Sequence, residues 1–473
     1  MGNQNQSHEE NPLSMRREKR SLGARVNGDV RIEFGSQKLT SFSGLELLGR
    51  FLRGIELDRR IRRAFAGSSM AGDYPVVSMI RLVLTLLWIG GRRLSHVGFV
   101  QADPMVLRLA CLRRLPHERT LSRWLKQFTS KTVGILARLN AQVVVETLRL
   151  LGARRVTVDV DGSVISTGLQ VSWAQRGFNP HRRKVPSYYP ILAHVAQTGQ
   201  VFAVRTRPGN VHDGKGSEHF LREVTSGIRA ELGRRTVMEF RLDGAFFLRP
   251  VLEALGRLDV EYALKVPMHQ WLGLKPMIAN RCRWHRMNGE ISYFEAVLPV
   301  DCWDMELPVV IYRRRVRHKT RKNFQLDLFD PNDGHYEYSA VTTNKGIGAV
   351  ALWNFMAGRG AQEKTIAELK DGLAFDTVPT NHYGANRAWQ QLSVLALNLL
   401  RRFQIEAGAE RRRRSRKRTY LHVLESIKTA RFQWLNVAGR LVSTNGTRIL
   451  RLTEVPAVLR RYENLEGGLR KAA

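Results

Sequence analysis

The spacing of apolar residues changes at Arg155, and this change limits what the chain can fold into. From about residue 39 to residue 151, apolar residues recur at the three- and four-residue spacing of buried helix faces. From residue 156 to residue 161, valines alternate instead with threonine and aspartate, which is the two-residue period of a strand. The pattern therefore excludes a purely helical bundle and predicts a helical region followed by a sheet.

The segments after Arg155 follow the order of three strands, a helix, a strand, a helix and a strand. The strands are expected at 156–161, 189–196, 201–207, 236–242 and 262–266, and the helices at 220–232 and 247–258. A meander followed by parallel crossovers is typical of the ribonuclease H-like mixed sheet, in which acidic residues at strand ends gather divalent metal. Residues 270–345 hold short β-like runs before helical spacing returns, so we expect a β insertion there.

The charge of the chain indicates its partner. Lys and Arg number 76 against 42 Asp and Glu, a formal charge of +34, while 43% of the residues are hydrophobic. A compact fold with this much self-repulsion favours a polyanionic partner, and nucleic acid is the first choice. The longest apolar run, Val76 to Ile89, carries Arg81 and is too short for a bilayer helix. Three cysteines without metal-ligand spacing indicate a reducing compartment. We expect a cytoplasmic, nucleoid-associated protein without a membrane partner.

Two basic features are candidate DNA contacts. Arg119, Arg123 and Lys126 form a stripe opposite an apolar stripe, which suits the recognition helix of a helix-turn-helix. An ordinary amphipathic helix with a solvated face explains this pattern equally well. Seven of the eight residues from Arg411 to Arg418 are basic, which favours contact with the DNA backbone. The candidates in that run are Arg411, Arg412, Arg413 and Arg414.

These observations predict an α/β chain with a ribonuclease H-like mixed sheet, a mostly β insertion and an all-helical N-terminal DNA-binding region. The expected parts are a disordered basic arm (1–25), the helical DNA-binding region (26–150), the first part of the core (151–268), the β insertion (269–345), the second part of the core with a catalytic glutamate helix (346–405), and a basic C-terminal region for DNA binding or dimerisation (406–473).

Carboxylates recur at the predicted strand ends. Asp159, Asp161 and Asp243 lie there, and two-metal phosphoryl transfer needs about three carboxylates around two metal ions. A late helix offers Glu363 or Glu368 as the third. At about 100° per residue, Glu363 lies about 40° from Arg359, whereas Glu368 lies about 180° away. Glu363, beside a cation that can hold a DNA phosphate, is the better choice, and Glu368 is expected to be a surface charge or a structural partner.

Three segments resemble bacterial insertion-sequence transposases of the DDE type. They are 158–163, 241–247, and Arg359 with Glu363 and Lys370, and the resemblance covers about residues 100–405. The tyrosine of the family's tyrosine-arginine-glutamate-lysine signature is replaced by Met356. The resemblance implies Asp161, Asp243 and Glu363 as catalytic, metal-binding acids, with Asp159 as an alternate ligand or a support for one. It also implies Mg²⁺, for which Mn²⁺ can substitute, and DNA contacts by Arg359 and Lys370.

The implied function is cut-and-paste transposition. Such an enzyme binds the terminal inverted repeats of an insertion sequence, cleaves the ends and joins them to target DNA, commonly as a homodimer that holds paired ends. Two alternatives stay open at this point. One is a ribonuclease H-like, metal-dependent nuclease without strand transfer, because the same carboxylates serve both reactions. The other is a non-catalytic DNA-binding protein, which leaves the acidic residues unexplained.

Overall fold

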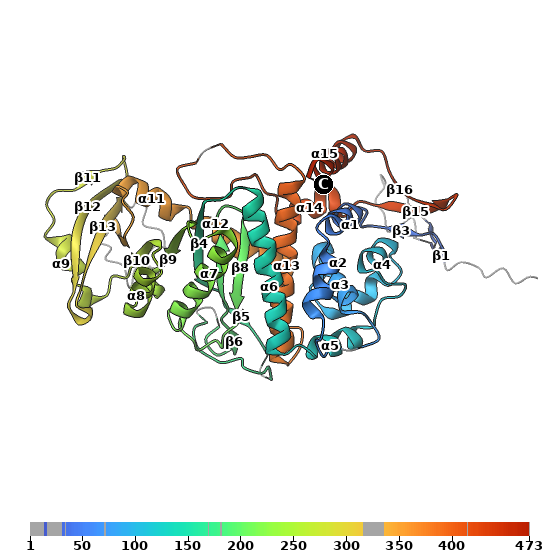
Figure 1. The fold of residues 1–473 in the computed structure, drawn as a ribbon, viewed down its shortest axis with the longest axis horizontal. Helices are drawn as coiled ribbons and strands as arrows, with labels where there is room; N and C mark the ends of the chain where they lie inside the picture. Colours follow the sequence, from blue (N-terminus) through green and yellow to red (C-terminus); the bar gives the residue numbers. More distant parts are fainter. Residues whose placement is uncertain are drawn as a thin grey trace, which may run out of the picture.

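The computed structural model describes residues 14–16, 31–33, 35–70, 72–168, 170–179, 182–315, 335–413 and 415–472. The molecule is elongated, with the N-terminal helices at one end and strands β11 to β13 at the other (Figure 1). The arm expected over residues 1–25 falls outside the described residues except for β1 (Ser14–Arg16), which pairs antiparallel with β2 (Arg31–Glu33). Arg414 also lies outside them.

Helices make up most of the N-terminal region, as the spacing predicts. The helices are α1 (Leu45–Gly54), α2 (Leu57–Phe65), α3 (Val76–Ile89), η2 (Leu94–Val100), α4 (Pro104–Ala110), α5 (Glu118–Lys126) and α6 (Ser130–Leu150). α6 begins with a capping box. The hydroxyl oxygen of Thr129 accepts a hydrogen bond from the backbone N–H of Thr132, and the hydroxyl oxygen of Thr132 accepts one from the backbone N–H of Thr129. The exceptions to the all-helical expectation are β2 and the short strand β3 (Leu39–Thr40), which pairs with a strand from the C-terminal region.

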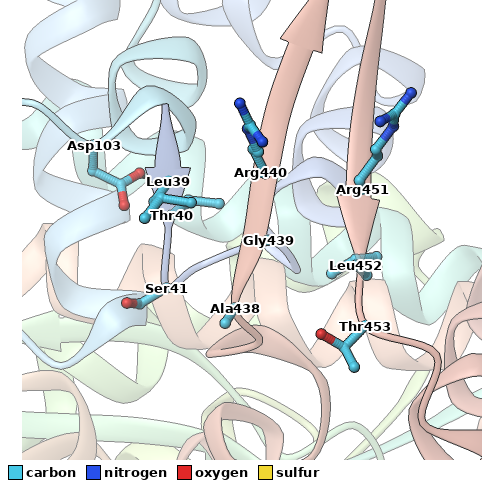
Figure 2. A pocket seen from close by; sticks show the side chains of 10 residues that line it. All are labelled: Leu39, Thr40, Ser41, Asp103, Ala438, Gly439, Arg440, Arg451, Leu452 and Thr453. Atoms are coloured by element: carbon cyan, nitrogen blue, oxygen red, sulfur yellow. Dashed lines mark hydrogen bonds between the residues drawn. The ribbon is translucent and has the colours of Figure 1, made fainter. Parts of the chain in front are cut away.

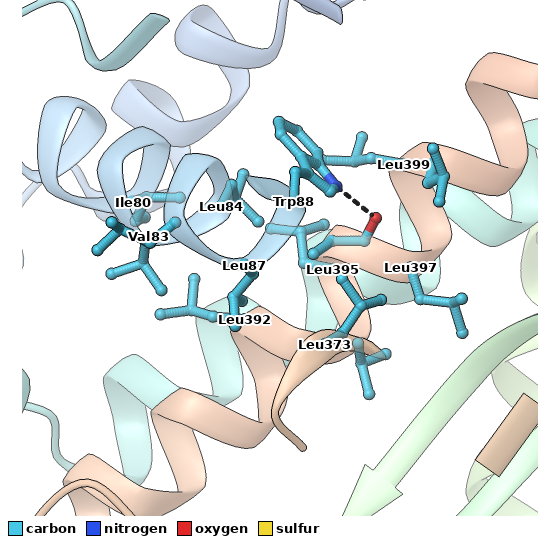
Figure 3. Close-up of a cluster of buried hydrophobic side chains, with 14 of the residues drawn as sticks. Ile80, Val83, Leu84, Leu87, Trp88, Leu373, Leu392, Leu395, Leu397 and Leu399 are labelled. Atoms are coloured by element: carbon cyan, nitrogen blue, oxygen red, sulfur yellow. Dashed lines mark hydrogen bonds between the residues drawn. The ribbon is translucent and has the colours of Figure 1, made fainter. Parts of the chain in front are cut away.

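One hydrophobic core joins the N-terminal helices to the long helix α13 (Tyr383–Glu406). Figure 3 shows apolar side chains of α3 meeting leucines of α13. At this contact the indole Nε1 of Trp88 donates a hydrogen bond to the backbone oxygen of Ala396 at 3.0 Å. α6 packs on α13 and also on the sheet strand β8. The helical region and the α/β core, separated in the sequence prediction at residue 150, therefore share one core.

The central sheet is mixed, as the strand pattern predicts. Its strands are β4 (Arg155–Gly162), β7 (Ile191–Val195), β8 (Gln200–Arg205), β9 (Val237–Leu242) and β10 (Glu261–Val266). They lie in the order β8-β7-β4-β9-β10, with β4, β9 and β10 parallel and β7 antiparallel to its neighbours. The crossover helices are α7 (Ser217–Leu232) and α8 (Arg249–Arg257), and a small hairpin joins β5 (Ile165–Ser166) to β6 (Ser187–Tyr188). This is the predicted ribonuclease H-like arrangement.

The insertion continues this sheet. Its strands are β11 (His285–Arg286), β12 (Ile291–Val300), β13 (Met305–Arg315) and β14 (Tyr336–Thr343), with α9 (Leu274–Ala279) before them. β14 pairs antiparallel with β10, so the described strands form a nine-stranded sheet in the order β11-β12-β13-β14-β10-β9-β4-β7-β8. Three short 3₁₀ helices lie between elements of the core and the insertion: η3 (Gly244–Phe246), η4 (Gln270–Leu272) and η5 (Asp301–Trp303). The predicted β insertion is thus present as an extension of the core sheet.

The chain then returns to helices and ends beside the N-terminal region. The remaining elements are α11 (Ala349–Ala357), α12 (Gly360–Leu373), α14 (Ile427–Ala430), η6 (Arg431–Leu435), β15 (Gly439–Thr444), β16 (Thr447–Leu452) and α15 (Pro456–Ala472). The buried residues Trp434 and Leu435 join the core of the N-terminal helices. Among the residues that the structure describes, no helix is both long enough and apolar enough to cross a membrane.

Candidate active site

Asp161 and Asp243 meet at one edge of the central sheet. Asp161 lies near the end of β4, and Asp243 directly follows β9. Because β4 and β9 are parallel neighbours, their carboxyl ends reach the same edge. Both carboxylates face the guanidinium of Arg359: Nη2 lies 2.9 Å from Oδ2 of Asp161 and 3.4 Å from Oδ2 of Asp243. The structure therefore brings together two of the three acids that the sequence singled out.

The Asp161 carboxyl is held in an environment that disfavours its charge. Its pKa is raised to about 7, chiefly by burial and also by the neighbouring Asp243 and Asp213, while Arg359 acts in the opposite direction. Carboxylate oxygens crowded in this way are the ligands that Mg²⁺ and Mn²⁺ prefer. A divalent cation held by Asp161 and Asp243 would offset their repulsion with two positive charges, where one guanidinium supplies one. The donor set at this edge of the sheet thus fits a divalent metal.

The cations Arg359 and Lys370 face the protein. The Arg359 side chain is 17% exposed, and the carboxylates of Asp161 and Asp243 raise its pKa although burial opposes them. Lys370 Nζ donates a hydrogen bond to the backbone oxygen of Val164 at 3.0 Å, and burial lowers the pKa of its ammonium. Both cations therefore bind the segment that carries Asp161, and their expected contacts with DNA stay a prediction.

Glu363 lies on the first turn of α12, and its residue is exposed. Its charge acts on Arg359, whose pKa it raises together with the aspartates. Within the described ranges, however, no three or more His, Cys, Asp or Glu side chains form a group that could hold a metal ion. The role of Glu363 as the third ligand stays a prediction.

Glu368 occupies the opposite face of the same helix. Its carboxylate accepts a hydrogen bond from the backbone N–H of Ile427 at 2.8 Å and another from Arg401, whose side chain is 3% exposed. Glu368 is therefore a structural partner, which the helical-face argument predicted as one of its two possible roles.

Asp159 is fully buried, and its carboxylate already has partners. Nη2 of Arg241 donates to its Oδ2 at 2.8 Å, and Nε of Arg241 contacts Oδ1. Nδ1 of His194 lies 3.0 Å from Oδ2, and burial lowers the pKa of this imidazole. Both carboxylate oxygens are thus engaged, which argues against Asp159 as an alternate metal ligand and favours Asp161 as the first acid. Asp159 instead anchors Arg241 across the strand pair.

Asp213 is a neighbour of the site that the sequence left unassigned. Tyr189 Oη donates to its Oδ2 at 2.6 Å, Arg207 Nη2 donates to its Oδ1 at 3.1 Å, and burial raises its pKa. A Cβ on Gly162 would lie 2.1 Å from Oδ1 of Asp213, so only glycine admits this approach directly after Asp161. The sequence feature that could have pointed to Asp213 is the segment 207–213, because it follows the predicted strand 201–207 and contains both Arg207 and Asp213.

The basic stripe lies on an exposed helix face, as predicted. Arg119, Arg123 and Lys126 of α5 are exposed, while its apolar stripe is buried. α5 packs against η2 and α13, and residues 111–117 separate it from α4. That connection is longer than the three- or four-residue turn of a typical helix-turn-helix. Whether α5 is a recognition helix stays a prediction.

Arg411, Arg412 and Arg413 are exposed on an extended segment. The backbone N–H of Arg412 donates to the backbone oxygen of Leu421 at 2.8 Å, so this segment is fixed to its neighbour. The guanidinium Nε of Arg412 donates to the backbone oxygen of His422 at 3.1 Å. The run is therefore held at the surface by its backbone, with charged side chains outside.

The metal-free protein is expected to lose stability as the pH rises from about 4 to about 7. In this window the folded state keeps a proton on Asp161 that the unfolded chain has released, because the folded pKa is about 7 against an ordinary 3.8. Rising pH removes that advantage, and Asp161→Asn should flatten this part of the stability curve. Urea unfolding of both proteins across the window checks this, and parallel curves for the two proteins contradict it.

Comparisons with known proteins give a family and two distant structures. The sequence profile of the family described as "Transposase DDE domain group 1" matches residues 23–472. No curated protein sequence matches the chain. A piggyBac transposase synaptic complex with hairpin DNA is similar over 81% of this chain and 80% of that chain, with 10% identity and a TM-score of 0.42. A Mos1 transposase paired-end complex with the left transposon end is similar over 44% of this chain and 66% of that chain, with 11% identity and a TM-score of 0.18. Both TM-scores are too low to support a conclusion about this chain. The family match, in contrast, covers most of the chain.

Proposed function

The chain belongs to the family of transposases with a group 1 DDE domain, enzymes that use divalent metal to cleave and transfer DNA, and we propose that it mobilises a bacterial insertion sequence. In this proposal it binds the terminal inverted repeats, cleaves the ends and joins them to target DNA by two-metal-ion phosphoryl transfer. A homodimer that holds two ends is the expected assembly, since inverted repeats mirror a two-fold protein symmetry. Its place of action is then the nucleoid.

The observation that carries the proposal is the pair of carboxylates that share Arg359. Asp161 and Asp243 end neighbouring parallel strands and face one cation at 2.9 and 3.4 Å. In this proposal Asp161, Asp243 and Glu363 hold Mg²⁺, or Mn²⁺ in its place. Bound divalent metal supplies activation of the attacking oxygen and charge stabilisation of the leaving oxygen. Arg359 and Lys370 are the proposed contacts with DNA phosphates.

Tyr189, Arg207 and Asp213 support this arrangement from the side. Asp213 is fixed by two hydrogen bonds and lies against the backbone of Gly162, next to Asp161. In the proposal it limits where the Asp161 carboxylate can point and adds negative charge next to the metal site. It is a positioning residue, since its own oxygens are already engaged.

A strand-transfer assay tests the proposed function. The substrates are two duplexes that carry the inverted repeat flanking the gene, one intact with its flanking DNA and one with a pre-cut 3′ end, and the target is a supercoiled plasmid. With Mg²⁺ we expect covalent joining of the end to the plasmid, and no joining with a chelator. Metal-dependent cleavage without joining would indicate the nuclease alternative. Binding without cleavage or joining would indicate the non-catalytic alternative.

The two basic features are expected to contribute differently to DNA binding. Replacing Arg411 to Arg413 with alanine should weaken binding to repeat and random duplexes alike and flatten the salt dependence, because phosphate contacts release counterions without reading bases. Replacing Arg119, Arg123 and Lys126 should reduce the preference for the repeat, since base-edge contacts contribute about 1–3 kcal/mol of discrimination each.

Binding titrations of both duplexes at several salt concentrations decide between these roles. Equal losses on the two duplexes after substitution of the α5 stripe would make it a phosphate contact. The absence of any loss would make the stripe a solvated helix face.

A further inference from the structure

The hairpin β15–β16 presents two arginines side by side on one face of a small sheet. The order of this sheet is β16-β15-β3, and the register pairs Arg440 with Arg451 and also with Leu39. Directly paired residues of antiparallel strands point to the same face, so these three side chains form a row across the sheet. Figure 2 shows both arginine side chains extending alongside each other from the two strands.

The opposite face of the hairpin packs against the protein. Leu441 pairs with Leu450 on that face, and Leu450 packs against the core of the N-terminal helices. Arg440 and Arg451 are exposed, so their face is the one turned to solvent. Arg448 pairs with Ser443 and therefore belongs to the leucine face. The same strand thus carries one arginine on each face.

The charge of the arginine pair has no counterpart in the described part of the chain. Neither Arg440 nor Arg451 forms an ion pair or a side-chain hydrogen bond there. Like charges directly opposite each other destabilise a strand pair. The nearby carboxylate of Asp103 already accepts hydrogen bonds from Thr40 Oγ1 and from the backbone N–H groups of Met105 and Val106. An anion between the two guanidinium groups would remove this repulsion.

A cavity beside the pair has room and polar groups for such an anion. Its volume is about 540 Å³, and its lining combines both arginines with the carboxylate of Asp103 and the hydroxyl residues Thr40, Ser41 and Thr453 (Figure 2). Guanidinium groups bind phosphate oxygens with two parallel hydrogen bonds, and the hydroxyl groups of Ser41 and Thr453 add neutral donors, whereas that of Thr40 already donates to Asp103. We propose that Arg440 and Arg451 together bind a phosphodiester group of the DNA backbone. The proposal rests on the proposed function, since DNA is taken as the ligand.

The position of the hairpin favours a duplex over a free phosphate ion. The hairpin extends from the end of the molecule beyond the N-terminal helices (Figure 1). In this proposal, a DNA molecule bound at the catalytic edge has a second contact at this end of the protein.

Single and paired substitutions test the site with a matched control. Binding of a random 40-base-pair duplex is measured for Arg440→Ala, Arg451→Ala, the double variant and Arg448→Ala, which removes the same charge from the opposite face of the hairpin. Because the pair holds one phosphate in this proposal, the double variant should lower the slope of log affinity against log salt by about 0.9, and each single substitution should lower it by no more than that. Arg448→Ala should keep the wild-type slope, and lysine at both positions should restore part of the binding. Thermal melting confirms that each variant is folded.

Three results would overturn the inference. They are a wild-type slope in the double variant, equal losses in Arg448→Ala and Arg440→Ala, and binding of inorganic phosphate that depends on the pair without any change in duplex binding. The last result would assign the site to a free phosphate. Failure of the wild-type protein to bind any duplex would instead contradict the proposed function.

Discussion

Asp161→Asn is expected to reduce metal-dependent DNA cleavage by about 10³-fold while DNA binding stays within about twofold. The substitution keeps the size of the side chain and removes the charge of the proposed metal ligand at the end of β4. Little surface that faces DNA changes. Asp243→Asn and Glu363→Gln should give the same pattern. Cleavage of labelled end DNA and a gel-shift titration of the same DNA measure the two effects.

Asp371→Asn is the matched control for these variants. Asp371 lies on α12 like Glu363, its side chain is 65% exposed, and its contact with Lys428 is long at 3.9 Å. Removing its charge should leave cleavage unchanged. Full cleavage by any of the three acid variants would exclude that residue from the catalytic site. Loss of cleavage in Asp371→Asn would show that cleavage depends on the net charge of the helix and not on a metal ligand.

Asp159→Ala is expected to lower the free energy of unfolding by about 3–5 kcal/mol, although Asp159 lies only two residues from Asp161. Its carboxylate and the guanidinium of Arg241 are both fully buried. Arg241 also donates to the backbone oxygens of Phe355 at 2.8 Å and Arg418 at 2.9 Å. Removing Asp159 leaves a buried charge without its counterion and loosens three segments that meet at Arg241. Chemical unfolding at constant pH measures the change.

A double variant separates charge from packing at this pair. Asp159→Leu with Arg241→Met removes both charges, so it should recover part of the stability that Asp159→Ala loses. Wild-type stability of Asp159→Ala together with a loss of metal binding would contradict this account, because it would make Asp159 a ligand.

The strands and crossover helices of the core could be predicted from the sequence because alternation and helical spacing are local signals. The place of the insertion could not be predicted in the same way. It depends on the pairing of Ala263 in β10 with Thr343 in β14, two residues that are 80 positions apart in the sequence. A run of β-like residues shows that strands form, whereas the neighbour of each strand is decided by tertiary packing. The described strands consequently form one extended sheet.

The candidate acids could be identified from their positions at strand ends, but their environments could not. Asp159 and Asp161 share a strand face, so their spacing does not distinguish them. What separates them is the cross-strand neighbours of Asp159, namely His194 on β7 and Arg241 on β9. The helical angle placed Arg359 near Glu363, yet it could not show that Arg359 contacts two aspartates. Asp213 was left unassigned because it lies in the loop after the predicted strand 201–207 and not at the end of that strand.

Calorimetric titration of Mn²⁺ into the wild-type protein and into Asp161→Asn, Asp243→Asn and Asp371→Asn tests the central claim most directly, since it reports metal binding without requiring DNA chemistry. The account predicts that the wild-type protein and Asp371→Asn bind Mn²⁺ with the same affinity. It predicts at least about tenfold weaker binding for Asp161→Asn and Asp243→Asn. Equal Mn²⁺ affinity in all four proteins would contradict the assignment of the metal site to the edge of the sheet where β4 and β9 end.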